Sequence, residues 1–165
     1  MNYHNITVDD MLNGDGLRTV LWVSGCMHHC RGCQNPQTWD AKSGIPFDEA
    51  AKEELFADLS RDYMDGITFS GGDPLCPANR ETVGRLIAEI RDRFPQKTIW
   101  LYTGDLFESF RDTLPFLPLI DVIVDGPYVE ALRDVNLCWR GSKNQRVIDV
   151  KQTLATGKVV LWARN

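Results

Sequence analysis

Three cysteines lie close enough together to hold one metal centre. Cys26, Cys30 and Cys33 form the pattern C-x3-C-x2-C within eight residues of the chain. Clustering of this kind indicates metal binding rather than disulfide pairing. Thiolates are soft ligands that favour zinc, copper(I) or iron–sulfur centres. The spacing therefore predicts a metal site in the loop that follows a β-rich segment.

The number of cysteines favours one of the possible metals without excluding the others. A closed zinc site has four ligands, usually as two separated pairs, so His28 or His29 would have to complete it. Ordinary ferredoxin sites fill every corner of a four-iron cluster with cysteine. Three cysteines would leave one iron open to a ligand from outside the protein, which is a catalytic arrangement. Iron–sulfur is favoured, while zinc, or thiols grouped by coincidence, stay open as alternatives.

A pair of glycines follows a second β-rich segment. The stretch S-G-G-D-P at residues 70–74 comes at the end of this segment. Gly71 and Gly72 allow backbone carbonyl groups to approach a cationic ligand closely, and Asp73 would favour a positive charge. The same residues are common in simple turns, which is the structural alternative. Because the motif follows a predicted strand, we predict that it contributes to a binding site.

Strands and helices alternate along the chain, and the motifs come at strand ends. Strands are predicted at residues 18–24, 66–70, 98–102, 121–124, 146–150 and 158–162. Helices are predicted at about residues 46–61, 78–94 and 106–111. This order is typical of an α/β fold with a mostly parallel sheet, in which ligands bind beyond the C-terminal ends of the strands. We therefore expect the motifs to converge on one edge of the sheet.

The composition limits the classes of protein that the chain could represent. Its 165 residues suit one domain, predicted as residues 1–165, and 43% hydrophobic with 25% charged residues is typical of a globular chain. A formal net charge of −5 disfavours nucleic acid as a partner. No window has the roughly 18 apolar residues of a membrane span. The polar N-terminus shows no signal peptide, and five cysteines without one indicate a cytoplasmic location.

The wider sequence around the cysteines resembles a known family. C-x3-C-x2-C at the end of a first strand is similar to the signature of radical S-adenosylmethionine enzymes. The string G-C-M-H-H-C-R-G-C-Q-N followed by T-W resembles the activating proteins of anaerobic ribonucleoside-triphosphate reductase. Further matches are N-G-x-G-x-R at residues 13–18, S-G-G-D-P-L at 70–75, V-D-G at 124–126 and W-R-G-S-x-N-Q at 139–145. The resemblance covers roughly residues 13–148, although the family often has proline where this chain has Asp15.

The resemblance implies a cofactor, a reaction and two partners. Cys26, Cys30 and Cys33 would hold a [4Fe–4S] cluster, whose fourth iron would be chelated by the amino and carboxylate groups of S-adenosylmethionine. Reductive cleavage would yield methionine and a 5′-deoxyadenosyl radical, which takes a hydrogen atom from a glycine Cα. The implied partners are the large subunit of the anaerobic reductase, which carries this glycine, and an electron donor such as a flavodoxin. The implied fold is a partial, open (β/α) barrel of the radical S-adenosylmethionine type.

The resemblance assigns the rest of the cofactor site to two backbone segments. Gly71, Gly72 and Asp73 resemble the G-G-E motif of the superfamily, which receives the methionyl amino group. Many radical enzymes have an aromatic residue where this chain, like the reductase activators, has Gly32. The backbone from Gly32 to Gln34 would then lie against adenine, unless Gly32 simply forms a tight turn.

Other residues are predicted together with structural alternatives. Thr103, Asp105 and Asp125 could touch ribose or methionine groups or bind a cation, and each is equally suited to a helix cap or a turn. Cys76 and Cys138 are predicted to pack as small apolar groups rather than to bind metal.

Three other functions stay open. A different small radical S-adenosylmethionine activase or modification enzyme would share the cluster, although the W-R-G-S-x-N-Q match argues against it. A zinc-stabilised binding module would use the cysteines and a histidine and would be colourless. A plain electron-transfer protein would be brown, as the enzyme would be, but would not cleave S-adenosylmethionine.

Overall fold

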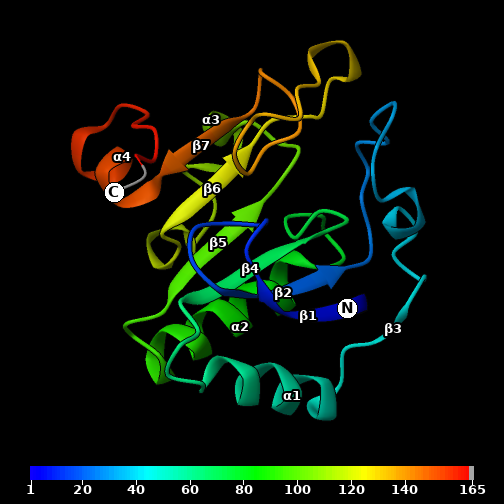
Figure 1. Ribbon diagram of the computed structural model, residues 1–165, viewed down its shortest axis with the longest axis vertical. Helices are drawn as coiled ribbons and strands as arrows, with labels where there is room; N and C mark the ends of the chain where they lie inside the picture. Colours follow the sequence, from blue (N-terminus) through cyan, green and yellow to red (C-terminus); the bar gives the residue numbers. More distant parts are fainter. Residues whose placement is uncertain (164–165) are drawn as a thin grey trace.

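The computed structural model describes residues 1–163 as a seven-stranded sheet with helices packed against it (Figure 1). The strands are β1 (Asn2–Asp10), β2 (Arg18–Val23), β3 (Ile45–Pro46), β4 (Gly66–Gly71), β5 (Thr98–Tyr102), β6 (Val122–Asp125) and β7 (Arg146–Asp149). Their order across the sheet is β3-β1-β2-β4-β5-β6-β7. The prediction of an α/β fold is confirmed.

The sheet is parallel in its centre and antiparallel at both edges. The pairs β2–β4, β4–β5 and β5–β6 are parallel. The pairs β3–β1, β1–β2 and β6–β7 are antiparallel. The sheet is therefore mixed, whereas the sequence indicated a mostly parallel one. Because β2, β4, β5 and β6 run in the same direction, the loops that follow them leave from one edge, as expected (Figure 1).

Of the four helices within residues 1–163, three match the sequence prediction, whereas the last had none. The four are α1 (Glu49–Leu59), α2 (Arg80–Arg93), α3 (Phe107–Phe110) and α4 (Val150–Thr156). Asp48 caps α1 by accepting a hydrogen bond from the backbone N–H of Ala51, which satisfies one of the free donors at a helix start. In α2, Val83, Leu86 and Ile87 are buried, which is the predicted apolar face.

One strand prediction differs from the structure, and the strands β1 and β3 were not predicted. Residues 158–162, which are described, form no strand; Leu161 makes only an isolated bridge to Ile148. Gly157 ends α4 in the left-handed conformation, and the chain then returns past β7 as a loop. Conversely, β1 had no prediction. Its residues are mostly polar and only Tyr3 is buried, so it lacks the apolar run by which the inner strands were found.

The two faces of the sheet are covered differently. Ile99 and Leu101 on β5 belong to the main apolar cluster, which includes the buried faces of α1 and α2. Trp100 points to the other face, since successive strand residues alternate, and it contacts the rings of Trp139 and Trp162. This second face also supports the cavity described below.

A buried arginine completes the second face. Arg18 is fully buried and lies over the Trp100 ring. Its guanidinium donates to the hydroxyl groups of Thr68 and Thr98 and to the carbonyl groups of Asp15 and Ile67. Burial lowers the pKa of Arg18 to about 10, so the group stays charged at neutral pH. Arg18 thereby fixes the loop of residues 11–17 above the sheet.

Candidate functional site

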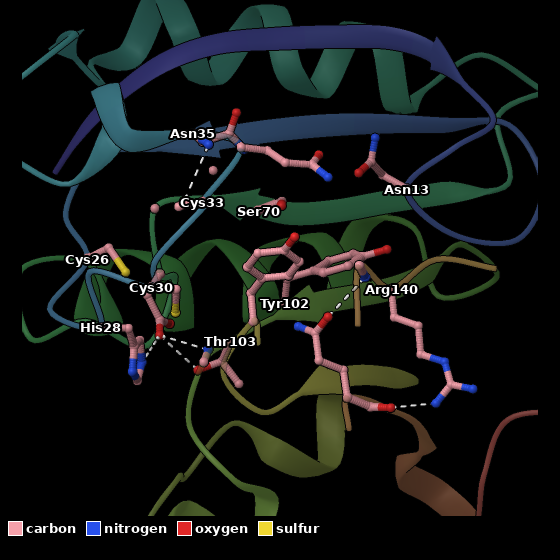
Figure 2. A pocket seen from close by; sticks show the side chains of 18 of the residues that line it. Asn13, Cys26, His28, Cys30, Cys33, Asn35, Ser70, Tyr102, Thr103 and Arg140 are labelled. Carbon is pink, nitrogen blue, oxygen red and sulfur yellow. Dashed lines mark hydrogen bonds and ion pairs between the residues drawn. The ribbon is translucent and has the colours of Figure 1, made fainter. Parts of the chain in front are cut away.

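The predicted motifs meet at one cavity of about 440 Å³ beyond the C-terminal ends of the central strands. Its lining comes mainly from the loops after β2, β4, β5 and β6, and the loop after β1 adds Leu12 and Asn13. Cys26, Cys30 and Cys33 contribute one end of it (Figure 2). The expected convergence of the strand-end motifs on one edge is therefore present in the structure.

The cysteine loop, residues 25–39, is held by its own backbone. Gly25 and Cys26 donate to the carbonyl groups of Thr38 and Trp39, at 2.7 and 3.0 Å. The backbone N–H of Asn35 lies 3.3 Å from the sulfur of Cys33. All three cysteines are unpaired thiols. Burial raises the pKa of the Cys26 thiol, while the backbone N–H of His28 acts in the opposite direction. A loop with three thiols and backbone donors to sulfur suits a metal–thiolate centre.

The two residues expected near adenine occupy different positions. Gln34 lines the cavity, whereas Gly32 is not among its lining residues. Gly32 has a φ of +71°, and a Cβ there would lie 2.9 Å from Oε1 of Glu130. The left-handed φ explains the glycine without a ligand, whereas the Glu130 carboxylate ends a flexible side chain that can move aside.

The glycine pair brings two strand ends together. A Cβ on Gly71 would lie 2.7 Å from backbone atoms of Val23, and one on Gly72 would lie 2.5 Å from the carbonyl oxygen of Gly25. The backbone N–H of Asp73 donates to the same oxygen at 2.7 Å. Both glycines also line the cavity. They are needed for the close approach of the cysteine loop to β4, and they leave backbone atoms facing the cavity.

The carboxylate of Asp73 connects three loops. Asp73 is only 3% exposed. Its Oδ2 lies 2.8 Å from Nε2 of His28 and accepts from the Thr103 hydroxyl at 3.0 Å and from the Gly104 N–H at 3.2 Å. Oδ1 accepts from the backbone N–H of Leu75. This hydrogen bonding raises the pKa of His28, so an imidazolium beside the carboxylate is favoured. Asp73 thus holds three loops of the site together. The cationic group nearest to its carboxylate among the described residues is the imidazole of His28.

The three polar residues predicted with structural alternatives take different positions in the structure. Thr103 bonds to Asp73, and Asp105 lies 3.7 Å from His28. Asp125 is fully buried, accepts from the Phe107 N–H and pairs with Arg146, which is a structural role. Cys76 is half-buried, and its packing as a small apolar group stays a prediction.

One cysteine prediction is wrong. Cys138 is exposed, so it does not pack as an apolar group. It lies in the loop before the W-R-G-S-x-N-Q motif, where neighbouring side chains reach the cavity and its own does not line it. In this exposed loop the Cys138 side chain has no apolar surroundings in which to pack.

Several cavity residues had no predicted role. Asn13, Tyr102, Tyr128 and Arg140 all line it. Tyr102 ends β5 and faces the cavity because of strand alternation, and burial raises the pKa of its hydroxyl well above the usual range. The motifs N-G-x-G-x-R and W-R-G-S-x-N-Q were the available signals for Asn13 and Arg140.

Among the described residues, no helix is both long enough and apolar enough to span a bilayer.

Comparison with known proteins identifies the family. A family model for a 4Fe-4S single cluster domain matches residues 12–148. The anaerobic ribonucleoside-triphosphate reductase-activating protein of Enterobacteria phage T4 is 47% identical over 147 residues, which cover 89% of this chain and 93% of the relative. The protein of the same name from Escherichia coli (strain K12) is 45% identical over 150 residues, covering 89% and 97%. The chain belongs to the family of anaerobic ribonucleoside-triphosphate reductase-activating proteins.

Proposed function

We propose that this chain is a radical S-adenosylmethionine enzyme that installs a glycyl radical on an anaerobic ribonucleoside-triphosphate reductase. One observation carries the proposal. The three thiols of the cysteine loop and the Gly71–Gly72 backbone line the same cavity. A cluster ligand set and a backbone surface for a bound cofactor are thereby side by side, in a chain whose relatives are named for activation of that reductase.

The residues at this end of the cavity fit a cluster with an open iron. Cys26, Cys30 and Cys33 are the proposed ligands, and the Asn35 N–H at 3.3 Å is suited to stabilise the Cys33 thiolate. A zinc site would need His28 or His29 as its fourth ligand, and Nε2 of His28 already lies 2.8 Å from Asp73. The cluster and S-adenosylmethionine would together supply the carbon radical that takes a hydrogen atom from glycine.

The protein's own groups are proposed to bind and orient S-adenosylmethionine and to hold the loops around it. The backbone of Gly71 and Gly72 is proposed to face the methionyl amino group, and Gln34 to face the adenosyl part. Asp73 keeps the cysteine loop and the loop after β5 at a fixed separation through His28 and Thr103. Residues 1–165 are proposed to form one radical S-adenosylmethionine domain with a partial, open barrel. The parallel centre of the sheet supports this assignment.

Anaerobic reconstitution tests the proposal. The chain, loaded with iron and sulfide, then reduced and given S-adenosylmethionine, should release 5′-deoxyadenosine and form a glycyl radical on the reductase, visible by electron paramagnetic resonance. Reduced flavodoxin should replace a chemical reductant if it is the electron donor.

Single cysteine variants identify the ligands. Cys26→Ala, Cys30→Ala and Cys33→Ala should each lose the cluster and the cleavage together. Cys138→Ala is the matched control, because this exposed cysteine does not line the cavity. Stoichiometric zinc without iron in oxygen-free protein, or cleavage retained by any of the three variants, contradicts the proposal.

A further inference from the structure

A cationic side chain lies at the end of the cavity away from the cysteines. Arg140 lines the cavity and is half-buried, and its guanidinium lies on the side that faces away from the cysteines (Figure 2). Its guanidinium donates to the backbone carbonyl of Gln145. Within residues 1–163 it forms no ion pair, whereas the similarly buried Arg91 and Arg146 pair with Asp121 and Asp125. Arginine has five N–H donors, so Arg140 keeps donors for a ligand in the cavity.

The loop that carries Arg140, residues 139–145, is held in place from several sides. The side chain of Gln145 accepts from the backbone N–H groups of Gly141 and Ser142 at 2.9 and 3.1 Å, and it donates to the carbonyl of Gly126 at 3.1 Å. Trp139 has a φ of +60°, a strained backbone for a tryptophan that the surrounding contacts must maintain. A cation presented by such a fixed loop is preorganised for binding.

The mouth of the cavity suits a polypeptide better than a small anion. Leu12, 81% exposed, and Leu137 both line the cavity, and they come from the loops after β1 and β6. Exposed apolar side chains at a cavity favour an occupant with apolar surface of its own. Arg140 lies in the same loop region as Leu137 and would meet an entering chain.

The chemistry of the target indicates which atoms Arg140 would bind. Glycine has no side chain, so an enzyme that positions its Cα can hold that residue only through the main chain. Main-chain carbonyl groups accept hydrogen bonds, and arginine can donate several from one fixed plane. The cysteines and Arg140 at opposite ends would leave the middle of the cavity for the hydrogen transfer.

We propose that Arg140 is a positioning residue that binds main-chain carbonyl oxygens of the glycine-bearing segment of the partner reductase. This inference rests on the proposed function and names the part of the site that holds the protein substrate. It assigns a role to the W-R-G-S-x-N-Q motif, which supplies the arginine and, through Gln145, the hydrogen bonds that hold it.

The test compares the two products of the reconstituted holoenzyme. Arg140→Gln should lower the glycyl radical formed per 5′-deoxyadenosine released by at least tenfold and raise the KM for the reductase. Arg140→Lys keeps the charge but has a single donor group, so it should show an intermediate loss; it also serves if the glutamine variant folds poorly. Arg133→Gln is the control, because Arg133 is exposed in the same segment and does not line the cavity.

Two results would overturn this role. An unchanged ratio of radical to 5′-deoxyadenosine would show that Arg140 does not hold the reductase. A parallel fall of both products, with a raised KM for S-adenosylmethionine, would place Arg140 at the cofactor instead. Failure of the proposed function is distinguishable, since the wild-type protein would then release no 5′-deoxyadenosine.

Discussion

The two faces of the sheet use the same strands but different kinds of side chain. On the helix-covered face of β4, Ile67 and Phe69 are fully buried in the main apolar cluster. On the other face of this strand, the Thr68 hydroxyl accepts from Arg18 and donates to the carbonyl of Asn13. Apolar burial is not directional, whereas hydrogen bonds fix the positions of atoms. We infer that the helix-covered face sets stability and the cavity face sets the geometry of the site.

The largest expected loss of stability comes from the helix-covered face. Phe69→Ala removes a fully buried ring from the main cluster and should lower the free energy of unfolding by about 3–5 kcal/mol. Phe69→Leu keeps most of the volume and is the matched control, with a smaller loss. Urea unfolding of the apoprotein measures both. A loss below about 1 kcal/mol for the alanine variant would contradict the division between the faces.

Arg18 shows that the cavity face also contains a group on which stability depends. Arg18→Met keeps a long apolar side chain but leaves the buried acceptors around Thr68 and Thr98 without their donor. The expected loss is about 2–4 kcal/mol, because unpaired buried polar groups are costly. Urea unfolding of the apoprotein gives this value. A methionine variant as stable as the wild type would show that the guanidinium is dispensable.

Gly72 tests how closely the two strand-end loops must approach. A methyl group there would lie 2.5 Å from the backbone oxygen of Gly25, so Gly72→Ala should push the cysteine loop away from β4. The expected loss is about 1–3 kcal/mol, together with lower iron content after reconstitution. Gly157→Ala is the control: Gly157 has a positive φ, but a Cβ there meets nothing within 4 Å. It should cost stability without changing iron content, and equal iron loss in both variants would contradict the proposed close approach.

The same division explains how much of the fold was predictable. The inner strands carry apolar residues on the helix-covered face and were found as short β-rich runs. The apolar face of α2 was found from its helical spacing. Strand β1 was missed because it is an exposed, mostly polar strand near the sheet edge, and its position depends on pairing with β2 rather than on its own apolar residues.

The site was predictable in position but less so in its connections. The cysteines and the glycine pair were identified because their spacing along the chain is short. The partners of Asp73 come from His28 and Thr103, which are 45 and 30 residues away, so no local pattern reveals them. Gln145 likewise bonds to Gly126, 19 residues away. Hydrogen bonds between separate loops are set by the fold and become visible only when it is known.

The smallest expected effect concerns an ion pair between β7 and α3. Arg146 on β7 binds Glu108 on α3 at 2.8 Å and also pairs with buried Asp125. The hydrogen bond from Arg146 lowers the pKa of Glu108, so folding favours its ionised form. The resulting stability is present above the usual glutamate pKa, about 4, and is lost as the pH falls through the lowered value.

Glu108→Gln should therefore lower Tm slightly at neutral pH, and the difference from the wild type should vanish in acid. Since Glu108 is half exposed, solvent screening keeps the effect small. Glu81→Gln, in the exposed Glu81–Arg85 pair of α2, is the control. A difference that persists unchanged in acid would mean that Glu108 acts through packing rather than charge. Glu108 would then stabilise the fold without a preferred geometry, as the apolar side chains of the helix-covered face do.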